Sequence, residues 1–335
     1  MISLKSNKIK ALAAGLMLTL ALGALGCGGD KKEAGAKAEK VNVGIVQLVE
    51  HAALDAANKG FVDGLASKGY KEGQNITFDK QNAQADQSNL QNIAHRFVNN
   101  KVDLICAIAT PAAQTVANVT SDIPIVATAV TDYKTAKLVK DDSKPGTNVT
   151  GTTDMNPVAE QLDLLVKLVP NAKTIGTIYC SSEVNSQLQV ELLKKAAAAK
   201  GITVKEATVS TVNDIQQAAR SLAGDVQAVY VPTDNVLASA IPTLISVTEE
   251  AKLPVICAEG GMVRAGGLAT LGVDYYKLGF QTGVMAADIL SGKSKPADMA
   301  IQAQKEFKPT INLKEAAKIG LKVPEDLLKG AEVIK

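Results

Sequence analysis

The chain has 335 residues and a formal net charge of +2. Its first 27 residues contain lysines and no acidic residue, so the rest of the chain has a net charge of about −1. This balance gives no reason to expect a nucleic-acid partner. The length that follows residue 40 favours two domains over one.

The first 27 residues predict an export signal. Lysines precede an uncharged apolar run at 11–25, which is too short for a comfortable membrane span, because roughly 20 apolar residues are needed. The sequence ALGC at 24–27 resembles the lipobox of bacterial lipoproteins, although Ala24 stands where leucine is preferred. The resemblance implies a signal peptide at 1–27, acylation of Cys27 and membrane anchoring of an exported protein, periplasmic or on the cell surface. Secretion with cleavage nearby is the alternative.

Residues 28–40 contain no large apolar side chain and predict a flexible tether. From Val41 onward, short apolar β-branched runs alternate with longer stretches rich in Ala, Leu and Lys. We expect strands at VNVGIVQL, NITFDKQ, DLICAIAT and IPIVATAV, then at KTIGTIYC, TVKEATV, AVYVPT, LPVICAEG and LATLGVDY. This alternation is typical of parallel βαβ units. The predicted fold class is therefore α/β, with two Rossmann-like lobes built on parallel sheets.

The second half of the chain echoes the first. Gly44 and Gly69 are 25 residues apart, and so are Gly176 and Gly201. The segment DLICAIATPAAQ also matches QAVYVPTDNVLA, and DIPIVATAVT matches KLPVICAEGG. We infer that each half is the same strand–helix unit.

Turn-forming residues indicate where the chain passes between the halves. One candidate crossover is SKPGTNVTG at 143–151, and a second lies near the glycine pairs at 260–267. We expect the next strand and helix to return to the first lobe, and the tail to close against the second. The predicted N-terminal lobe is 41–150 plus about 265–300, and the C-terminal lobe is 151–264 plus about 301–335, joined by a multi-strand hinge.

Ligands of open parallel sheets bind beyond the carboxyl ends of the strands, at the switch point in strand order. Two sets of such loops, facing each other, predict a cleft between the lobes. The candidate ligand-binding residues in these loops are Gln47, Glu50, His51, Thr110, Pro111, Thr131, Asp132, Tyr133, Glu183, Asn185, Ser186, Thr233, Asp234, Asn235 and Glu259.

Nearly the whole chain after the tether resembles one family. The segments GIVQLVEHAALDAANKGFVDGLASKGY, TPAAQ, DIPIVATAVTD, NVTG, IYCSSEVNS, VPTDN and GLATLGVDYYKLG resemble ABC-transporter substrate-binding proteins, a family that includes tryptophan- and tyrosine-binding lipoproteins. The resemblance implies a type I periplasmic-binding-protein fold, an ABC permease as partner and an amino acid, with an aromatic one favoured, as ligand. Members commonly carry proline at the positions of Ala52 and Tyr133, so the wall of the first lobe differs here.

An amino-acid ligand needs acceptors for its ammonium and donors for its carboxylate, because unpaired buried charge is costly. Asp234 is our first choice for the ammonium, followed by Glu183 and Glu259. The alternative role for Asp234 is the N-cap of its own helix. If Asp234 binds the ligand, replacing it with alanine is expected to weaken binding without unfolding the protein.

The ligand carboxylate suits N–H groups at helix starts together with hydroxyl groups. The candidate hydroxyls are those of Thr110, Thr131 and Ser186. The threonine before Pro111 could equally cap a helix. Asn185 and Asn235 can both donate and accept, with local turn bonding as their alternative.

An aromatic ligand favours apolar or aromatic walls. The chain has no Trp, and Tyr133 and Tyr179 are the tyrosines near predicted strand ends. Either could stack on a ring, with packing in the core as the alternative. His51 is favoured as a cleft residue, and Arg264 is assigned to a structural ion pair in preference to a ligand carboxylate.

The residues give no sign of catalysis. Cys106, Cys180 and Cys257 follow Cys27 and are expected to be free apolar groups rather than a three-thiolate metal site. No dinucleotide, phosphate-loop or nucleophile-elbow motif is present, so we expect neither an enzyme nor a cofactor. We expect a monomer that closes around a small ligand. The alternatives are another small polar solute with the same transport role, or an extracytoplasmic ligand-sensing module.

Overall fold

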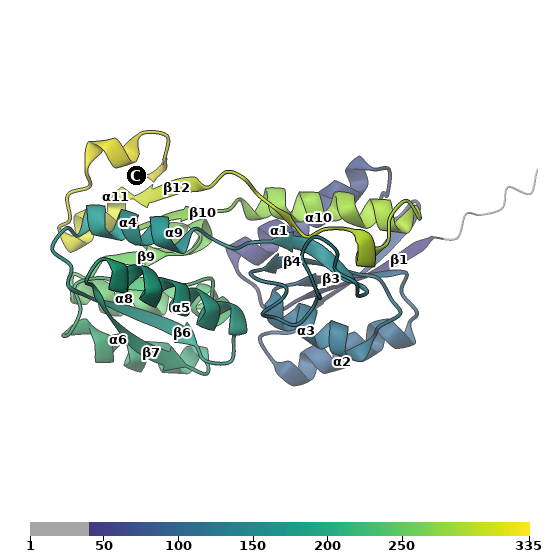
Figure 1. Cartoon of the computed structure of the whole chain (residues 1–335), viewed down its shortest axis with the longest axis horizontal. Coiled ribbons are helices and arrows are strands. Elements are labelled where there is room, and N and C mark those ends of the chain that lie inside the picture. Colours follow the sequence, from purple (N-terminus) through teal and green to yellow (C-terminus); the bar gives the residue numbers. More distant parts are fainter. Residues whose placement is uncertain (1–39) are drawn as a thin grey trace, which may run out of the picture. The chain divides into compact units, whose positions relative to one another are not determined.

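The computed structural model describes residues 40–335, which form two α/β lobes (Figure 1). Each lobe has one sheet with helices packed against it, and both sheets are dominated by parallel pairing. The predicted fold class is therefore confirmed. The predicted signal peptide, Cys27 and all but the last residue of the predicted tether lie outside the described residues, so export and lipid attachment stay predictions.

The first lobe has an entirely parallel sheet in the order β11-β5-β4-β3-β1-β2. Its strands are β1 (Val41–Gln47), β2 (Ile76–Asn82), β3 (Leu104–Ile108), β4 (Ile125–Val130), β5 (Val149–Thr153) and β11 (Gln302–Ala303). Its helices are α1 (Ala52–Ser67), α2 (Gln87–Asn99), α3 (Thr110–Val119) and α10 (Tyr275–Leu290), with the 3-10 helix η2 (Pro296–Asp298) beside β5.

The second lobe has the strand order β13-β12-β10-β9-β8-β6-β7, in which only the β10–β12 pair is antiparallel. Its strands are β6 (Thr174–Cys180), β7 (Thr203–Val209), β8 (Val229–Val231), β9 (Val255–Cys257), β10 (Ala269–Gly272), β12 (Lys308–Asn312) and β13 (Glu332–Ile334). Its helices are α4 (Val158–Leu168), α5 (Val184–Ala199), α6 (Ile215–Ala223), α7 (Asn235–Ser239), α8 (Ile241–Glu250), α9 (Gly260–Arg264) and α11 (Leu313–Ile319), with the 3-10 helices η1 (Val212–Asp214) and η3 (Glu325–Leu328).

The first five strands of each lobe follow the same order, in which the second strand lies outside the first and the third lies on its other side. This is the flavodoxin-like arrangement, with its switch point between the first and third strands. Gly44 and Gly176 occupy matching places in β1 and β6. A side chain on Gly44 would meet the Phe97 ring of α2 at 2.7 Å, and one on Gly176 would meet Leu222 of α6 at 3.0 Å. Both glycines therefore let a helix pack close to the first strand of its lobe.

The other two glycines of the repeat end equivalent helices. Gly69 follows α1 with φ of 93°, and Gly201 follows α5 with φ of 67°. Glycine adopts these left-handed conformations without a steric penalty. The common spacing of 25 residues thus reflects one strand–helix unit. Each unit has a glycine in its strand that allows close packing and a glycine that ends its helix.

Three segments of the described chain connect the lobes, at 154–157, 273–274 and 304–307. These positions correct the predicted boundaries. The predicted first lobe ended at residue 150, but β5 extends to Thr153 in the first sheet. Only α10, and not the strand before it, returns to the first lobe, because β10 pairs with β9 and β12. The tail from about residue 301 was predicted to belong to the second lobe, but β11 pairs with β5 and therefore belongs to the first.

The second and third connections are held together by one side chain. Gln304 accepts a hydrogen bond from the backbone N–H of Asp274 at 3.0 Å and donates one to the Asp274 carbonyl at 2.6 Å. The side-chain amide of Gln304 thus satisfies both the N–H and the C=O of one residue, as the backbone of a paired strand does. The two segments are thereby tied to each other between the sheets.

Helix α10 packs directly along α1 in the first lobe (Figure 1). Glycines on both helices allow the backbones to touch. A Cβ on Gly279 would lie 1.9 Å from the Ala57 carbonyl oxygen, and one on Gly60 would lie 2.1 Å from the Tyr276 carbonyl oxygen. Gly64 and Gly283 make similar approaches. The return of α10 to the first lobe therefore depends on the absence of side chains at these positions.

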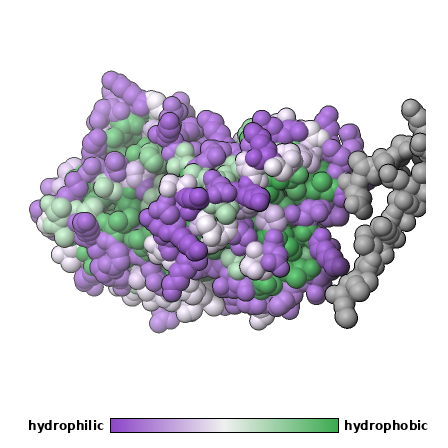
Figure 2. Space-filling model, turned by 45° about the vertical axis from the view of Figure 1, so that its right-hand side comes forward, coloured by the Kyte–Doolittle hydropathy of each residue, from purple (hydrophilic) through white to green (hydrophobic). Residues whose placement is uncertain are grey.

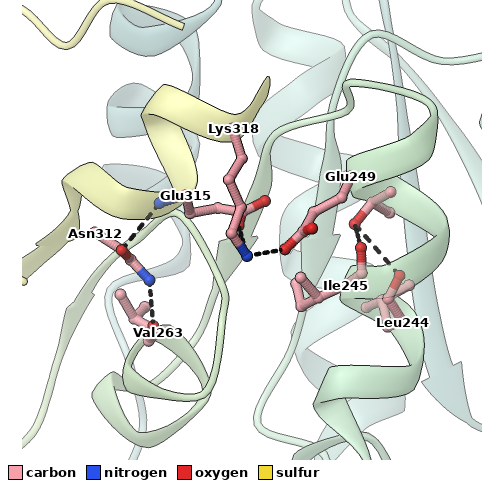
Figure 3. Close-up of polar contacts among 8 residues, drawn as sticks. Leu244, Ile245, Glu249, Val263, Asn312, Glu315 and Lys318 are labelled. Carbon is pink, nitrogen blue, oxygen red and sulfur yellow. Dashed lines mark hydrogen bonds and ion pairs between the residues drawn. The ribbon is translucent and has the colours of Figure 1, made fainter. Parts of the chain in front are cut away.

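The end of the chain is fixed to the second lobe through α11 (Figure 3). Asn312 accepts the N–H of Glu315 at 3.1 Å, which caps α11, and donates to the Val263 carbonyl at 3.1 Å. Lys318 of α11 forms an ion pair with Glu249 of α8. Glu315 is buried beside this pair, and burial, together with contact with Glu249, raises its pKa to about 7.

The hydrophobic core forms one cluster in the first lobe and two in the second. Hydrophilic side chains cover most of the face drawn in Figure 2, with hydrophobic ones between them. Among the described residues the exposed large hydrophobic side chains are Leu192, Val212 and Tyr276, which lie on α5, η1 and α10. The three exposed large hydrophobic side chains thus lie on three different elements.

Candidate functional site

A cavity lies where the loops after the strands of the two sheets meet. Its volume is about 10 Å³, which is room for about one water molecule. The first lobe and its connections contribute His51, Leu54, Ala129, Thr131, Asp154 and Tyr275, and the second lobe contributes Asn185, Thr233, Asp234, Asn235, Ala238, Glu259 and Met262. Seven of the candidate residues chosen from loops at the carboxyl ends of strands therefore line one cavity: His51, Thr131, Asn185, Thr233, Asp234, Asn235 and Glu259.

A larger groove of about 190 Å³ adjoins the cavity and shares Glu259 and Tyr275 with it. The groove runs over the first turn of α1 and over α9. Arg264 lies in its wall and pairs with Glu332 at 2.9 Å between Nη1 and Oε1. This contact is the structural ion pair expected for Arg264.

Asp234 caps helix α7. Its Oδ1 accepts the N–H of Leu237 at 2.9 Å, and its Oδ2 accepts the N–H of Cys180 at 2.6 Å and the hydroxyl of Ser186 at 2.8 Å. The side chain is 1% exposed, and burial raises its pKa while these donors oppose the rise. Asp234 therefore has the capping role that was the alternative to ammonium binding, and it also joins β6 to α5 and α7.

Glu183 is surrounded by N–H donors. Its Oε2 accepts from the side chains of Asn185 at 2.9 Å and Asn235 at 2.6 Å, and its Oε1 accepts from the backbone of Asn235 at 3.0 Å and Val236 at 3.2 Å. Burial and the neighbouring Asp234 raise the pKa of Glu183 to about 8. The carboxyl group is absent from the cavity lining, so it supports the wall of the cavity from behind.

Glu259 caps the short helix α9. Its two oxygens accept the N–H groups of Gly261 and of Met262, the latter at 2.7 Å. Burial raises its pKa, and the charge of Arg264 acts in the opposite direction. Glu259 therefore lines the cavity but already has backbone donors and a cation nearby.

Asp154 is a cavity residue that the predicted loops did not include. Its Oδ1 accepts the Thr131 hydroxyl at 2.9 Å, and its Oδ2 accepts the Tyr275 hydroxyl at 2.6 Å. It is 1% exposed, and burial raises its pKa. Asp154 was missed because β5, VTGTT, lacks an apolar run and was taken as part of a crossover. The available signal was an acidic residue directly after two threonines.

One side-chain hydrogen bond crosses the cavity from His51 to Asn235, with 3.2 Å between Nε2 and Oδ1. The Asn235 amide nitrogen points at Glu183, so its oxygen faces His51 and the histidine Nε2 must carry the proton. Burial lowers the pKa of His51, which keeps the ring neutral at pH 7. The two lobes are thus linked through a neutral histidine.

Two alanines at the carboxyl ends of first-lobe strands have left-handed backbones, with φ of 89° at Ala109 and 55° at Ala129. Such conformations are strained for residues other than glycine, and strain of this kind collects at functional sites. Ala129 lines the cavity, and Ala109 precedes α3. Thr110, the next residue, is 2% exposed, and its hydroxyl has no hydrogen-bond partner within residues 40–335.

The remaining candidates lie away from the cavity. Gln47 is buried and binds Asp55 and Asn58 of α1, Glu50 is exposed, and Asp132 accepts the N–H of Thr135. Pro111 occupies the first turn of α3, and Ser186 is bonded to Asp234. None of these side chains lines the cavity, so any contact that they make with a ligand requires rearrangement.

Tyr133 is a core residue in this structure. It is 1% exposed, and its hydroxyl donates to the carbonyls of Ala127 at 2.8 Å and Thr152 at 3.0 Å, where β4 and β5 lose register. The side chain is therefore part of the first-lobe core and does not line the cavity. This position fits the alternative that was weighed for Tyr133, packing in the core.

Replacing Tyr133 with phenylalanine is expected to lower the free energy of unfolding by about 1–2 kcal/mol, because two buried carbonyls lose a donor. Ligand affinity should be unchanged. Urea denaturation and calorimetric titration of both proteins test the two expectations. A loss of affinity without a loss of stability would instead place the hydroxyl in contact with ligand.

Cys106, Cys180 and Cys257 are buried and unpaired in the described part of the chain. Within residues 40–335 no group of histidine, cysteine and acidic side chains is arranged to hold a metal ion. The same range contains no helix that is both long and apolar enough to cross a membrane.

Two α/β lobes with a polar cavity between the ends of their strands are the architecture of the type I periplasmic-binding fold. Residues 42–335 match the family model described as ABC transporter substrate binding protein, and the chain belongs to this family. Its members bind solutes rather than catalyse reactions, and they act outside the cytoplasm. The class and family predicted from the sequence are therefore confirmed.

Individual relatives agree with this assignment. A curated tyrosine-binding protein of Clostridioides difficile is 48% identical over 79% of this chain and 76% of its own length. A crystal structure of an ABC domain in complex with L-Trp, from Streptococcus pneumoniae, is 41% identical, covers 89% of this chain and 100% of that one, and has a TM-score of 0.85. A ligand-free, open structure of a substrate-binding protein with adhesive properties, from Clostridium difficile, is 45% identical over 88% of this chain and 99% of that one, with a TM-score of 0.68.

Proposed function

We propose that this protein captures an amino acid, with an aromatic one favoured, and delivers it to an ABC permease. The observation that carries the proposal is the cavity, in which buried acidic, amide and hydroxyl groups from both lobes converge on one small space. Convergent polar groups at the switch point of parallel sheets are typical of small-molecule sites. The L-Trp and tyrosine named for two relatives support an amino acid as the ligand.

Capture requires the lobes to separate and close again. The cavity has room for about one water molecule, so an amino acid cannot enter or fit in the present arrangement. The three connecting segments supply the hinge, and the His51–Asn235 hydrogen bond spans the two sides. A ligand that contacts both lobes favours closure, because only a difference in affinity between two states shifts their populations.

We place the ligand carboxylate at the amino-terminal end of α3, which does not line the present cavity and would be reached when the lobes separate. The Thr110 hydroxyl is buried and lacks a partner within the described residues, and N–H groups at a helix start favour an anion. We also propose that Cys27 carries a lipid that anchors the monomeric protein to a membrane. Another small polar solute in the same transport role is the second candidate, favoured by the loss of proline at Ala52 and Tyr133.

Calorimetric titration with a panel of amino acids tests the proposal. The protein is first unfolded in denaturant and refolded, so that any carried-over ligand is removed. We expect saturable binding of tyrosine or tryptophan at one site. If the refolded protein binds no amino acid, while thermal unfolding shows that it is folded, the cargo assignment is wrong and the second candidate takes its place.

A further inference from the structure

We propose that Asp154, and not one of the acidic residues in the second-lobe loops, binds the ammonium group of the ligand, with Tyr275 as its positioning residue. This inference rests on the proposed function and names the group that recognises one end of the amino acid. It departs from the order of preference that the sequence suggested, in which Asp234 came first.

The acidic side chains of the cavity differ in the hydrogen bonds that they already make. Asp234 and Glu259 accept backbone N–H groups at the starts of α7 and α9, and a capping carboxylate cannot turn to a ligand without leaving those donors unpaired. Asp154 caps no helix, and its side-chain partners are the two hydroxyls of Thr131 and Tyr275. A hydroxyl can rotate its proton to another acceptor, so Asp154 is able to accept a new donor.

The cavity lining is rich in acidic side chains. The residues lining the cavity include Asp154, Asp234 and Glu259 but no lysine or arginine. Glu259 has Arg264 nearby, whereas hydrogen bonds alone offset the burial of Asp154. A buried carboxylate without a cation is costly, and a ligand ammonium would supply the missing charge.

The opposite wall of the cavity carries an acceptor that makes no hydrogen bond with the described residues. The Asn185 amide nitrogen donates to Glu183 and to the Thr233 carbonyl, so its Oδ1 must point elsewhere. This oxygen is buried and has no hydrogen-bond partner within residues 40–335, and Asn185 lines the same cavity as Asp154. An ammonium has three N–H donors and needs several acceptors. Asp154 and Asn185 thus offer one acceptor from each side of the cleft.

Tyr275 positions Asp154 for this role. Asp154 begins the first connecting segment and Tyr275 follows the second, so their 2.6 Å hydrogen bond joins two parts of the hinge. Thr131 ties the other carboxylate oxygen to the end of β4. An ammonium at Asp154 would therefore sit where the connections meet, in contact with the elements that move during closure.

Replacing Asp154 with asparagine tests the assignment, because the side chain keeps its shape and loses its charge. Affinity for L-tyrosine should fall about 100-fold, as expected when one partner of a buried charged pair is removed. Asp122→Asn, at an exposed carboxylate just before β4 and outside the cavity lining, is the matched control and should bind like the wild type. Thermal unfolding of each variant shows whether it is folded.

A ligand analogue gives an independent measurement. 3-(4-Hydroxyphenyl)propionate keeps the ring and carboxylate of tyrosine but lacks the ammonium. Wild-type protein should bind it about 100-fold more weakly than tyrosine, and Asp154→Asn should bind the two ligands about equally. If the variant does not fold, this comparison on wild-type protein still tests whether the ammonium is recognised.

The pH profile separates an electrostatic role from a structural one. Burial raises the pKa of Asp154 above the ordinary value for aspartate. Lowering the pH through this raised pKa protonates the carboxyl group and should weaken tyrosine binding to the wild type. The groups that also face the cavity are His51, Asp234, Glu259 and Tyr275. These groups are present in both proteins. The difference between the pH profiles of tyrosine affinity for wild type and Asp154→Asn therefore reports on Asp154. Proton release on binding, measured in two buffers of different ionisation enthalpy, should be larger for the wild type.

Equal tyrosine affinity of Asp154→Asn and wild type overturns the inference, and so does an identical pH profile. A wild type that binds no amino acid overturns the proposed function instead. Tyr275→Phe should weaken tyrosine binding less than Asp154→Asn does and should shift the pH profile, because the carboxylate loses one donor but keeps its charge.

Discussion

Replacing Gly279 with leucine is expected to lower the free energy of unfolding by about 3 kcal/mol or more. A Cβ at this position would lie 1.9 Å from the Ala57 carbonyl oxygen, and the obstacle is helix backbone rather than a flexible side chain. Helices α1 and α10 would have to separate, which would open the core of the first lobe. Because α10 begins at Tyr275, directly after the second connection, the hinge would shift as well.

Gly224→Ala is the matched control for this experiment. No atom lies within 4 Å of the position where its Cβ would be, and its φ of −87° suits any residue. Alanine there should change stability by less than about 0.5 kcal/mol or raise it slightly, since it restricts the unfolded chain. Urea denaturation followed by circular dichroism measures both variants. Equal stabilities would show that α1 and α10 do not need to approach closely.

Asp234→Ala should cost about 3 kcal/mol of folding stability and also abolish ligand binding. The change leaves the N–H groups of Cys180 and Leu237 without their acceptor in a buried place, and the Ser186 hydroxyl keeps only the Thr233 carbonyl, at 3.3 Å. The expectation from sequence, weaker binding without unfolding, is therefore extended by a loss of stability. The start of α7 carries Asn235, so its displacement would also break the bond to His51.

Asp86→Ala provides the comparison for Asp234. Asp86 caps α2 through the N–H of Asn89 at 2.8 Å, and it is exposed and does not line the cavity. Removing this cap should cost about 1 kcal/mol and leave ligand affinity unchanged. Thermal unfolding and calorimetric titration distinguish the two variants. If both lose the same stability, the buried position of Asp234 contributes nothing beyond capping.

The repeated strand–helix unit could be predicted from the sequence because it depends on local features. Strands buried on both faces appear as short apolar runs, and Gly69 and Gly201 occupy positions where a helix ends in a left-handed turn. The exact crossovers could not be predicted in this way. Strand β5 is rich in threonine and glycine, so its existence does not follow from local pattern. The strand at LATLGVDY was predicted, but its lobe was not, because β10 pairs with the distant β12.

The location of the site could be predicted from the sequence, but the carboxylate that can receive a ligand could not. The rule that ligands bind at the ends of parallel strands indicated loops that do meet at the cavity. Which carboxylate is free depends on hydrogen bonds between loops far apart in sequence, such as Asp234 with Cys180 and Asp154 with Tyr275. A single sequence contains no signal that separates a capping aspartate from one that can receive a ligand.

The three connecting segments limit the ways in which the lobes can move. A single linker would let one lobe swivel and slide, whereas three segments, two of them joined through Gln304 and Asp274, resist torsion and shear. Bending across the connecting segments is then the motion that they resist least. Each cycle of opening and closing would follow the same path, so the groups from the two lobes would meet a ligand in the same alignment every time.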